Sequence, residues 1–423
     1  MSGKEIFNQF QSLKISYLAI MKKITLLTGL IFLLLTQSYG QTKTKKLDYF
    51  PAYNNWQHKT PSQGGLDSNA LVKAIGFAMG HEAKSSRDGA LAQFQSFGKE
   101  PFSEAIGPLT DRGGPAGIIV YKGYVVAQWG DPDRVDIVNS VTKSFLSSIV
   151  GIAVDRGMIH STMDTVARYV PPIEVYNNTG HGHDNDIIYP FSSPQDRKLT
   201  WEVMLRQTSD WEGTLWGKPD WADRPTGDII QYKERKRNEP GTVWKYNDVR
   251  VNALALAALS VWRKPLPQVL KENVMDPIGA STTWRWFGYS NSYVVLDGQI
   301  MQSVSGGGHW GGGMFINAYD MGRFGLLTLH HGNWDGKQLI SEQWVKQALT
   351  PTTANTGYGY MNWFLNTDKK LLPSAPANTW VHIGNGTNMI YCDPDHDLVV
   401  VARWIDNNSM DGLISNVLQA VKK

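Results

Sequence analysis

The sequence predicts an α/β (α+β) fold, in which an antiparallel sheet is flanked by helices and a mainly helical domain is inserted. Two segments rich in β-branched and aromatic residues, 117–129 and 387–404, each have the pattern of a β-hairpin, and they lie far apart in the chain. The residues between them are rich in helical patterns and carry no strong strand signals. Two hairpins that frame a helical region favour one sheet built from both parts of the chain.

The individual elements follow from local composition. Residues 41–65 are polar and contain proline and glycine, which indicates a surface strap. Helical spacing of apolar residues occurs at 70–94, 139–157, 200–207 and 249–262, and a last helix begins near residue 412. The predicted organisation is an upstream segment with a signal peptide (1–40), the strap (41–65), a sheet domain (66–154 with 303–423) and a mainly helical domain (155–302).

The N-terminal segment has the pattern of a secretory signal. Lys22 and Lys23 precede an apolar run at 24–35, and a small residue, Gly40, stands before the expected cleavage point. The apolar run is short for a membrane span. We therefore expect a signal peptide at about 21–40, residues 1–20 upstream of the true start, and a periplasmic or secreted mature chain beginning near Gln41.

Charge and cysteine content argue against a nucleic-acid-binding protein and against a protein held together by disulfides. Residues 1–40 contain four lysines and one glutamate, and their removal leaves equal numbers of basic and acidic residues in a chain that carries +3 overall. A nucleic-acid partner is not expected, because such proteins concentrate basic residues on one face. The single cysteine, Cys392, excludes an intrachain disulfide.

The most informative motif is Ser140-Val-Thr-Lys143. Residues three apart on a helix share a face, about 5–6 Å apart, so Lys143 could accept the proton of Ser140 in a Ser-Lys form of acyl transfer. Asn139 is a candidate helix cap, and an apolar run that stops at Gly157 follows the motif. A second copy, Ser96-Phe-Gly-Lys99, has an internal glycine and is predicted to lie at a frayed helix end or in a loop, without a catalytic role.

Several other residues allow two interpretations. His181 and His183 have the spacing of metal ligands, but their Gly/Asn-rich context favours a surface loop, so no metal is predicted. Trp211 and Trp216 are candidates for an apolar acyl pocket or for core packing. The glycine-rich segment 306–313 lacks the flanking strand, helix and lysine of a phosphate loop, which favours close backbone packing.

Four motifs occur together in the order of a known family: Trp129 to Phe145, Leu199 to Ser209, Tyr246-Asn-Asp248, and Gly311 to Phe324. With them, the chain resembles the serine β-lactamase-like superfamily over roughly 117–404. It is most similar to the class C-like branch of family VIII esterases, D-aminopeptidases and 6-aminohexanoate-dimer hydrolases. The resemblance implies an α/β domain with an antiparallel sheet and a helical domain, in agreement with the pattern of elements.

The resemblance also implies residue roles. Ser140 would be acylated, with Lys143 and Tyr246 sharing general base and acid duty. The family's strand motif matches His382-Ile-Gly384, so the N–H groups of Ser140 and Asn385 would form the oxyanion hole. Substrate would contact Asp248, His382, Gly384, Trp211 and Trp216, and no cofactor is implied.

Two departures from the family pattern bear on the substrate. His382 replaces a lysine expected to hold a β-lactam carboxylate, and Asp248 stands where the family has asparagine. The sequence therefore predicts a secreted serine hydrolase acting on a small ester, amide or peptide-like substrate, rather than a true β-lactamase. One alternative is an idle relative that binds cell-wall peptide or polymer, and another is metal-dependent hydrolysis at His181 and His183.

Overall fold

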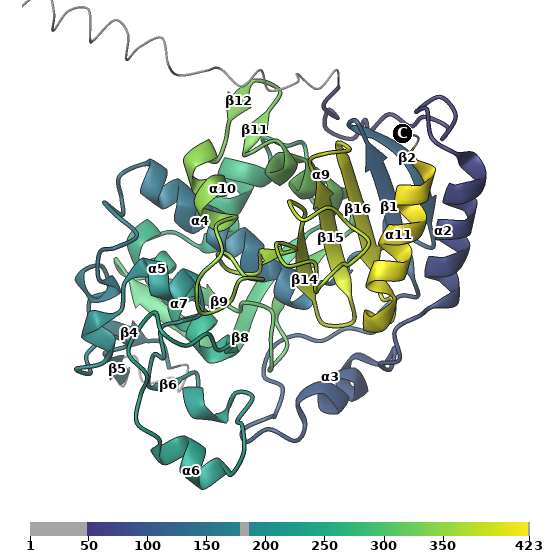
Figure 1. Ribbon diagram of the computed structural model, residues 1–423. Coiled ribbons are helices and arrows are strands. Elements are labelled where there is room, and N and C mark those ends of the chain that lie inside the picture. Colours follow the sequence, from purple (N-terminus) through teal and green to yellow (C-terminus); the bar gives the residue numbers. More distant parts are fainter. Residues whose placement is uncertain (1–48, 178–185, 422–423) are drawn as a thin grey trace, which may run out of the picture. The chain divides into compact units, whose positions relative to one another are not determined.

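The main sheet joins both hairpins. The computed structural model describes residues 49–177 and 186–421. Its main sheet is antiparallel with the strand order β13-β14-β15-β16-β1-β2 (Figure 1). The strands are β1 Ala116–Tyr121, β2 Tyr124–Trp129, β13 Phe364–Leu365, β14 Trp380–Gly384, β15 Asn388–Asp393 and β16 Leu398–Arg403. Because β1 pairs with β16 over its whole length, the sheet predicted from two distant hairpins is confirmed.

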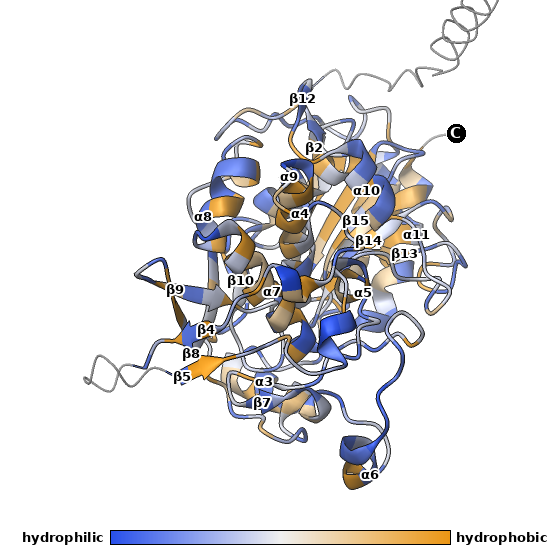
Figure 2. Ribbon diagram, turned by 90° about the vertical axis from the view of Figure 1, so that its left-hand side faces the viewer, coloured by the Kyte–Doolittle hydropathy of each residue, from blue (hydrophilic) through white to orange (hydrophobic). Residues whose placement is uncertain are grey.

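Helices cover both faces of this sheet. Val399 and Val401 face one apolar cluster together with helix α9 (Ala318–Leu329), whereas Val400 and Ala402 face a second cluster with α2 (Ser68–Gly80) and α11 (Met410–Ala420). This division follows from the two-residue period of a strand. The strands between the helices are largely apolar in Figure 2, as burial on both faces requires.

Helix α4 (Thr142–Asp155) lies deeper, behind α9. Phe145 of α4 stacks on Phe324 of α9, with ring centroids 4.0 Å apart. On its other side α4 contacts α7 (Asp248–Trp262). Residues 142–153 of α4 are all buried. The helix that carries Lys143 is thus fixed from both sides.

A second antiparallel sheet lies in the region that the sequence predicts to be mainly helical. Its strand order is β3-β10-β8-β4-β5, and β9 also pairs with β8. The strands are β3 Asp136–Ile137, β4 Ile173–Val175, β5 Asp186–Ile188, β8 Arg285–Leu296, β9 Gln299–Val304 and β10 Gly313–Ile316. The expectation of no strong strand there is wrong, because β8 has a register shift between Gly288 and Tyr293 that interrupts its hydrophobic alternation.

The segment before α2 lies along the edge of the main sheet. The Lys59 N–H donates to the carbonyl of Val125 in β2 (3.0 Å), and the Trp56 indole donates to the carbonyl of Gly123 (2.8 Å). The single helical stretch predicted at 70–94 is divided, since α2 ends at Gly80 and α3 (Gly89–Phe97) begins after an irregular connection.

The remaining elements are short. They are α5 Trp201–Leu205, α6 Ile229–Glu234, α8 Leu266–Leu270, η5 Lys271–Met275, α10 Glu342–Ala348, β6 Thr214–Leu215, β7 Lys218–Pro219, β11 Asn333–Trp334 and β12 Lys337–Gln338, with 3-10 turns η1 Asn139–Val141, η2 Val166–Arg168, η3 Asp196–Lys198, η4 Asp220–Ala222 and η6 Asn407–Ser409.

Residues 48–423 group into one compact unit, so the predicted boundaries within it stay predictions. The expected signal peptide and His181 and His183 lie outside the described residues. Within the described part, no helix is long and apolar enough to cross a membrane.

Candidate active site

Ser140 lies in a tight turn between a strand and a helix. The 3-10 turn η1 contains Ser140, and α4 begins two residues later. Asn139 adopts a left-handed conformation (φ 47°), which asparagine tolerates better than most residues. The prediction that Asn139 caps the helix is wrong, because its side-chain amide donates instead to the carbonyl of Asn385 (3.0 Å). The turn therefore ties Ser140 to the end of strand β14.

Lys143 is buried and contacts the Ser140 hydroxyl. Its Nζ donates to Ser140 Oγ at 2.7 Å and to the Gly306 carbonyl at 3.1 Å, and it forms an ion pair with Asp248 Oδ1 at 2.7 Å. A lysine ammonium has three N–H donors and no acceptor, and these contacts provide three acceptors. In the resting structure Lys143 is thus an ammonium ion that donates to Ser140.

The glycine-rich segment packs against this site through its backbone. A Cβ added at Gly307, which has φ +75°, would lie 2.1 Å from the Asn139 carbonyl oxygen. A Cβ at Gly308 would lie 2.3 Å from Cγ of Asp248. Only glycine permits both approaches, so close packing, as predicted, is the role of the segment. The approach lets the carbonyl of Gly307 accept from Ser140 Oγ at 3.3 Å.

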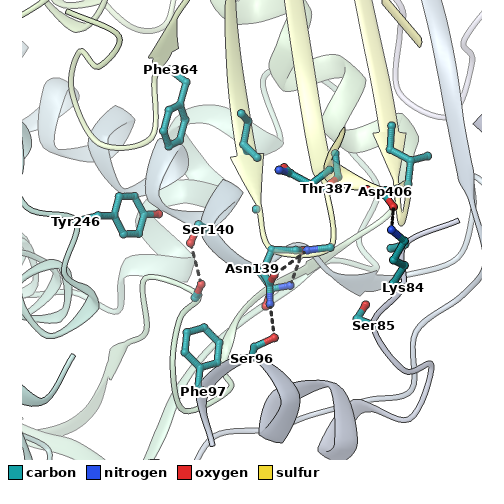
Figure 3. A pocket seen from close by; sticks show the side chains of 18 of the residues that line it. Lys84, Ser85, Ser96, Phe97, Asn139, Ser140, Tyr246, Phe364, Thr387 and Asp406 are labelled. Carbon is teal, nitrogen blue, oxygen red and sulfur yellow. Dashed lines mark hydrogen bonds and ion pairs between the residues drawn. The ribbon is translucent and has the colours of Figure 1, made fainter. Parts of the chain in front are cut away.

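Tyr246 lies across the cleft from α4. Its hydroxyl is directed toward Ser140 (Figure 3) and donates to Asn362 Oδ1 at 3.0 Å, while Lys143 Nζ is 5.1 Å from the ring centroid. Burial and the Asp248 carboxylate raise the pKa of Tyr246 well above its usual value, although the Ser140 hydroxyl acts in the opposite direction. Tyr246 is therefore a neutral phenol in the resting structure.

Asp248 belongs to a buried network of charges beneath the serine. Its Oδ2 accepts from Arg224 Nη1 at 2.8 Å, and the same Nη1 donates to Asp223. Burial opposes ionisation of Asp248, but Arg224 and Lys143 hold its pKa well below the usual range. His309 is also buried, with Nδ1 3.6 Å from Asp223. Asp223, Asp248 and His309 lie close enough to hold a metal ion, but Arg224 and Lys143 already neutralise both carboxylates.

Strand β14 brings Asn385 beside the serine. A Cβ at Gly384 would lie 2.0 Å from the Val138 carbonyl oxygen and 3.0 Å from the Ser140 nitrogen, so only glycine lets the strand pass this close. Asn385 follows directly and lines the same pocket as Ser140. Ser140 and Asn385, the two residues predicted to form the oxyanion hole, are thus neighbours at the pocket wall.

Four predicted substrate contacts are not on the pocket wall. Trp211 and Trp216 are buried in the core, and the Trp211 indole donates to the Pro190 carbonyl. His382 is fully buried, in edge contact with Trp363, and burial lowers its pKa to about 3. Asp248 lies beneath the pocket rather than in its lining. Apolar packing accounts for the positions of Trp211, Trp216 and His382. The ion pair with Lys143 accounts for the position of Asp248.

The pocket itself has a volume of about 570 Å³. Figure 3 shows side chains that line it. Ser140, Tyr246, Gly384 and Asn385 line it, as does Ser96, whose Oγ accepts from the side-chain amide of Asn385 at 2.9 Å. The second Ser-x-x-Lys copy begins in the last turn of α3, at a helix end as predicted, but the position of Ser96 at the pocket wall could not be predicted from local sequence. Further lining residues are Ala83, Lys84, Ser85, Phe97, Asn139, Arg224, Gly307, Phe364, Ile383, Gly386, Thr387, Ile405, Asp406 and Asn407.

A serine hydroxyl contacted by a buried lysine, with a tyrosine across a cleft, is the arrangement of a serine hydrolase. The sequence model of the family described as beta-lactamase matches residues 102–409, so the chain belongs to the beta-lactamase family.

Solved structures share this fold at low sequence identity. A family VIII carboxylesterase is 15% identical with a TM-score of 0.51, covering 84% of this chain and 97% of the other. The hydrolase EstCE1, titled as having promiscuous acyltransferase activity, is 14% identical with the same TM-score, covering 84% and 98%. A penicillin-binding protein homologue from Caulobacter crescentus is 14% identical at 0.51, covering 73% and 92%. At these identities the likeness concerns the fold.

Proposed function

We propose that this protein hydrolyses esters or amides through an acyl-enzyme on Ser140, with Lys143 and Tyr246 as the proton carriers. The observation that carries the proposal is the 2.7 Å hydrogen bond from the buried Lys143 ammonium to Ser140 Oγ, at the wall of an open pocket. A lysine placed on a serine hydroxyl can serve as its proton partner.

The protons can be followed through the reaction. The resting site holds a serine hydroxyl, a Lys143 ammonium and a Tyr246 phenol, so it becomes nucleophilic once one proton leaves Lys143 or Tyr246. Ser140 Oγ then attacks the carbonyl carbon and its proton passes to the deprotonated group. The same proton goes to the leaving oxygen or nitrogen as that bond breaks. Water repeats the sequence on the acyl-serine, which releases the acid and restores Ser140.

The negative charge of the tetrahedral intermediate has two stabilising donors. The N–H groups of Ser140 and Asn385 are proposed as the oxyanion hole, and each such donor typically lowers the barrier by about 2.7–4 kcal/mol. The first turn of a helix also presents N–H groups without intrahelical partners, and Ser140 lies in such a turn.

The substrate is proposed to be a small ester, amide or peptide-like compound. The proposal draws on two proteins that share the fold, the family VIII carboxylesterase and EstCE1, a hydrolase with promiscuous acyltransferase activity. A β-lactam is less favoured, because His382, where the family pattern has a lysine, is buried and neutral.

Trapping the intermediate tests the proposal. Residues 41–423, mixed with p-nitrophenyl acetate and quenched in acid, should carry one acetyl group, and peptide mapping should place it on Ser140. Turnover without a modified Ser140 would contradict the mechanism. If neither turnover nor acylation occurs with short esters, amides and D-amino-acid peptides, the idle binding protein becomes the better explanation.

We also propose that the chain is exported. The expectation rests on the charged start, apolar run and small residue at 21–40. N-terminal sequencing of the protein from a secreting host should give a start near Gln41. A mature protein that retains Met1 or Met21 would contradict cleavage.

A further inference from the structure

We infer that Arg224 binds a carboxylate group of the substrate, so that the preferred substrates carry a negative charge away from the scissile bond. This inference rests on the proposed function and adds a substrate class to it. Arg224 lines the same pocket as Ser140, and its guanidinium carbon lies 5.2 Å from the centroid of the Tyr246 ring. Its charge is thus next to the group proposed to carry protons.

One edge of the Arg224 guanidinium is used and the other is free. All its hydrogen bonds to Asp223 and Asp248 come from Nη1. Among the described residues, Nε and Nη2 have no hydrogen-bond acceptor, and the side chain is 33% exposed. The Nε and Nη2 groups of arginine point the same way and can bind both oxygens of a carboxylate. Arg87 uses this edge on Glu82 in the same chain, at 2.8 and 2.7 Å.

The position of Arg224 is fixed by other charged groups. Its backbone is left-handed (φ 47°), its N–H donates to Glu100 Oε1 at 3.2 Å, and its carbonyl accepts from Lys245 Nζ at 2.6 Å. A non-glycine residue in this conformation persists when the surroundings determine it, and such residues are frequent at ligand sites. The guanidinium is therefore preorganised, which lowers the entropic cost of binding an anion.

The hydrogen-bonding groups around the pocket favour an anion at this position. Asp223 and Asp248 are buried and pair with Nη1, so the Nε and Nη2 groups of Arg224 offer their N–H donors to the pocket. Two other charged side chains line the pocket, Lys84 and Asp406, and they form an ion pair with each other at 3.0 Å. The free N–H donors of Arg224 thus remain available for a ligand carboxylate.

Two pairs of esters test the inference on the whole mature chain. The mono-p-nitrophenyl ester of adipic acid and its terminal amide differ in charge on the acyl side, and 4-acetoxybenzoate and 4-acetoxybenzamide differ on the leaving side. In at least one pair the carboxylate should have the larger kcat/KM by about tenfold, the value of one charged hydrogen-bonded contact. Equal kcat/KM values in both pairs would overturn the inference.

Variants separate a specific contact from general charge. Arg224→Gln should bring the ratio of the two kcat/KM values to about one, and Arg224→Lys should retain part of it because the charge remains. Lys84→Gln removes a charge from the same pocket and should keep the ratio within about twofold, since exposed paired charges contribute little. A ratio that survives Arg224→Gln or disappears in Lys84→Gln would contradict the assignment to Arg224.

The ratio remains informative if the glutamine variant is unstable. Arg224→Gln leaves Asp223 and Asp248 with fewer cations, so its folding is checked by thermal unfolding. If this variant does not fold, the kcat/KM ratios of the wild type and of Arg224→Lys decide the test. Absence of turnover by the wild type with all four esters, and also with the amides and D-amino-acid peptides named above, would instead overturn the proposed hydrolase, and this inference with it.

Discussion

Replacing Ser140 with alanine is expected to lower kcat/KM for p-nitrophenyl esters by about 10⁴-fold or more, because removal of a nucleophile abolishes the covalent path. Ser140 is only partly buried, and its Oγ contacts Lys143 and the Gly307 carbonyl. The free energy of unfolding should therefore change by less than about 1 kcal/mol. The release of p-nitrophenolate measures the rates, and urea unfolding measures the stability.

The second Ser-x-x-Lys copy supplies a matched control. Ser96 lines the same pocket, but its Oγ contacts the side-chain amide of Asn385. Ser96→Ala should lower kcat/KM by less than about tenfold, the value of one hydrogen bond at the pocket wall. A folded Ser140→Ala variant that retains a tenth of the wild-type rate, or an equal loss in Ser96→Ala, would remove Ser140 as the nucleophile.

The features that sequence predicts well depend on neighbouring residues. Both hairpins of the main sheet, the buried helix after Ser140 and the close packing of residues 306–313 follow from local patterns that the structure repeats. The 2.7 Å contact of Lys143 with Ser140 also follows, because spacing along one helical turn brings the two side chains together.

The features that sequence does not predict depend on distant residues. Arg224 reaches the pocket through ion pairs with Asp223 and Asp248, and the pattern around residue 224 gives no sign of a binding role. Asn362 accepts a hydrogen bond from Tyr246, although the two residues are 116 positions apart in the chain. The burial of His382 likewise depends on Phe324 of α9 and on Trp363, which lies just before β13. Such contacts follow from tertiary packing, which periodicity cannot resolve.

The substitution of Asp248 for the asparagine of the family pattern has a physical consequence. A carboxylate 2.7 Å from the Lys143 ammonium stabilises that cation, and it also raises the pKa of the neighbouring Tyr246. Both effects keep a proton in the site. We therefore expect catalysis to depend on pH, with the rate rising as that proton is lost.

Replacing Lys143 with methionine is expected to lower kcat/KM by about 10³-fold at every pH, within the range of general acid-base catalysis. Methionine fills a similar volume but carries no proton. It also leaves the buried Asp248 with Arg224 as its remaining cation, so the free energy of unfolding should fall by about 3 kcal/mol. Steady-state kinetics from pH 5 to 10 and urea unfolding measure the two effects.

Asp248→Asn is the matched variant, since it keeps an acceptor for Lys143 and removes only the charge. Burial and the Asp248 charge together raise the pKa of Tyr246, so without the carboxylate this pKa should fall and the acid limb of the pH profile of kcat/KM should move to lower pH. Asp248 itself has a pKa well below the usual range, and thus its own titration does not produce that limb. If the acid limb stays in place in folded Asp248→Asn, this carboxylate does not control the proton of the site. If Lys143→Met keeps more than a tenth of the wild-type rate, Ser140 is activated without the lysine.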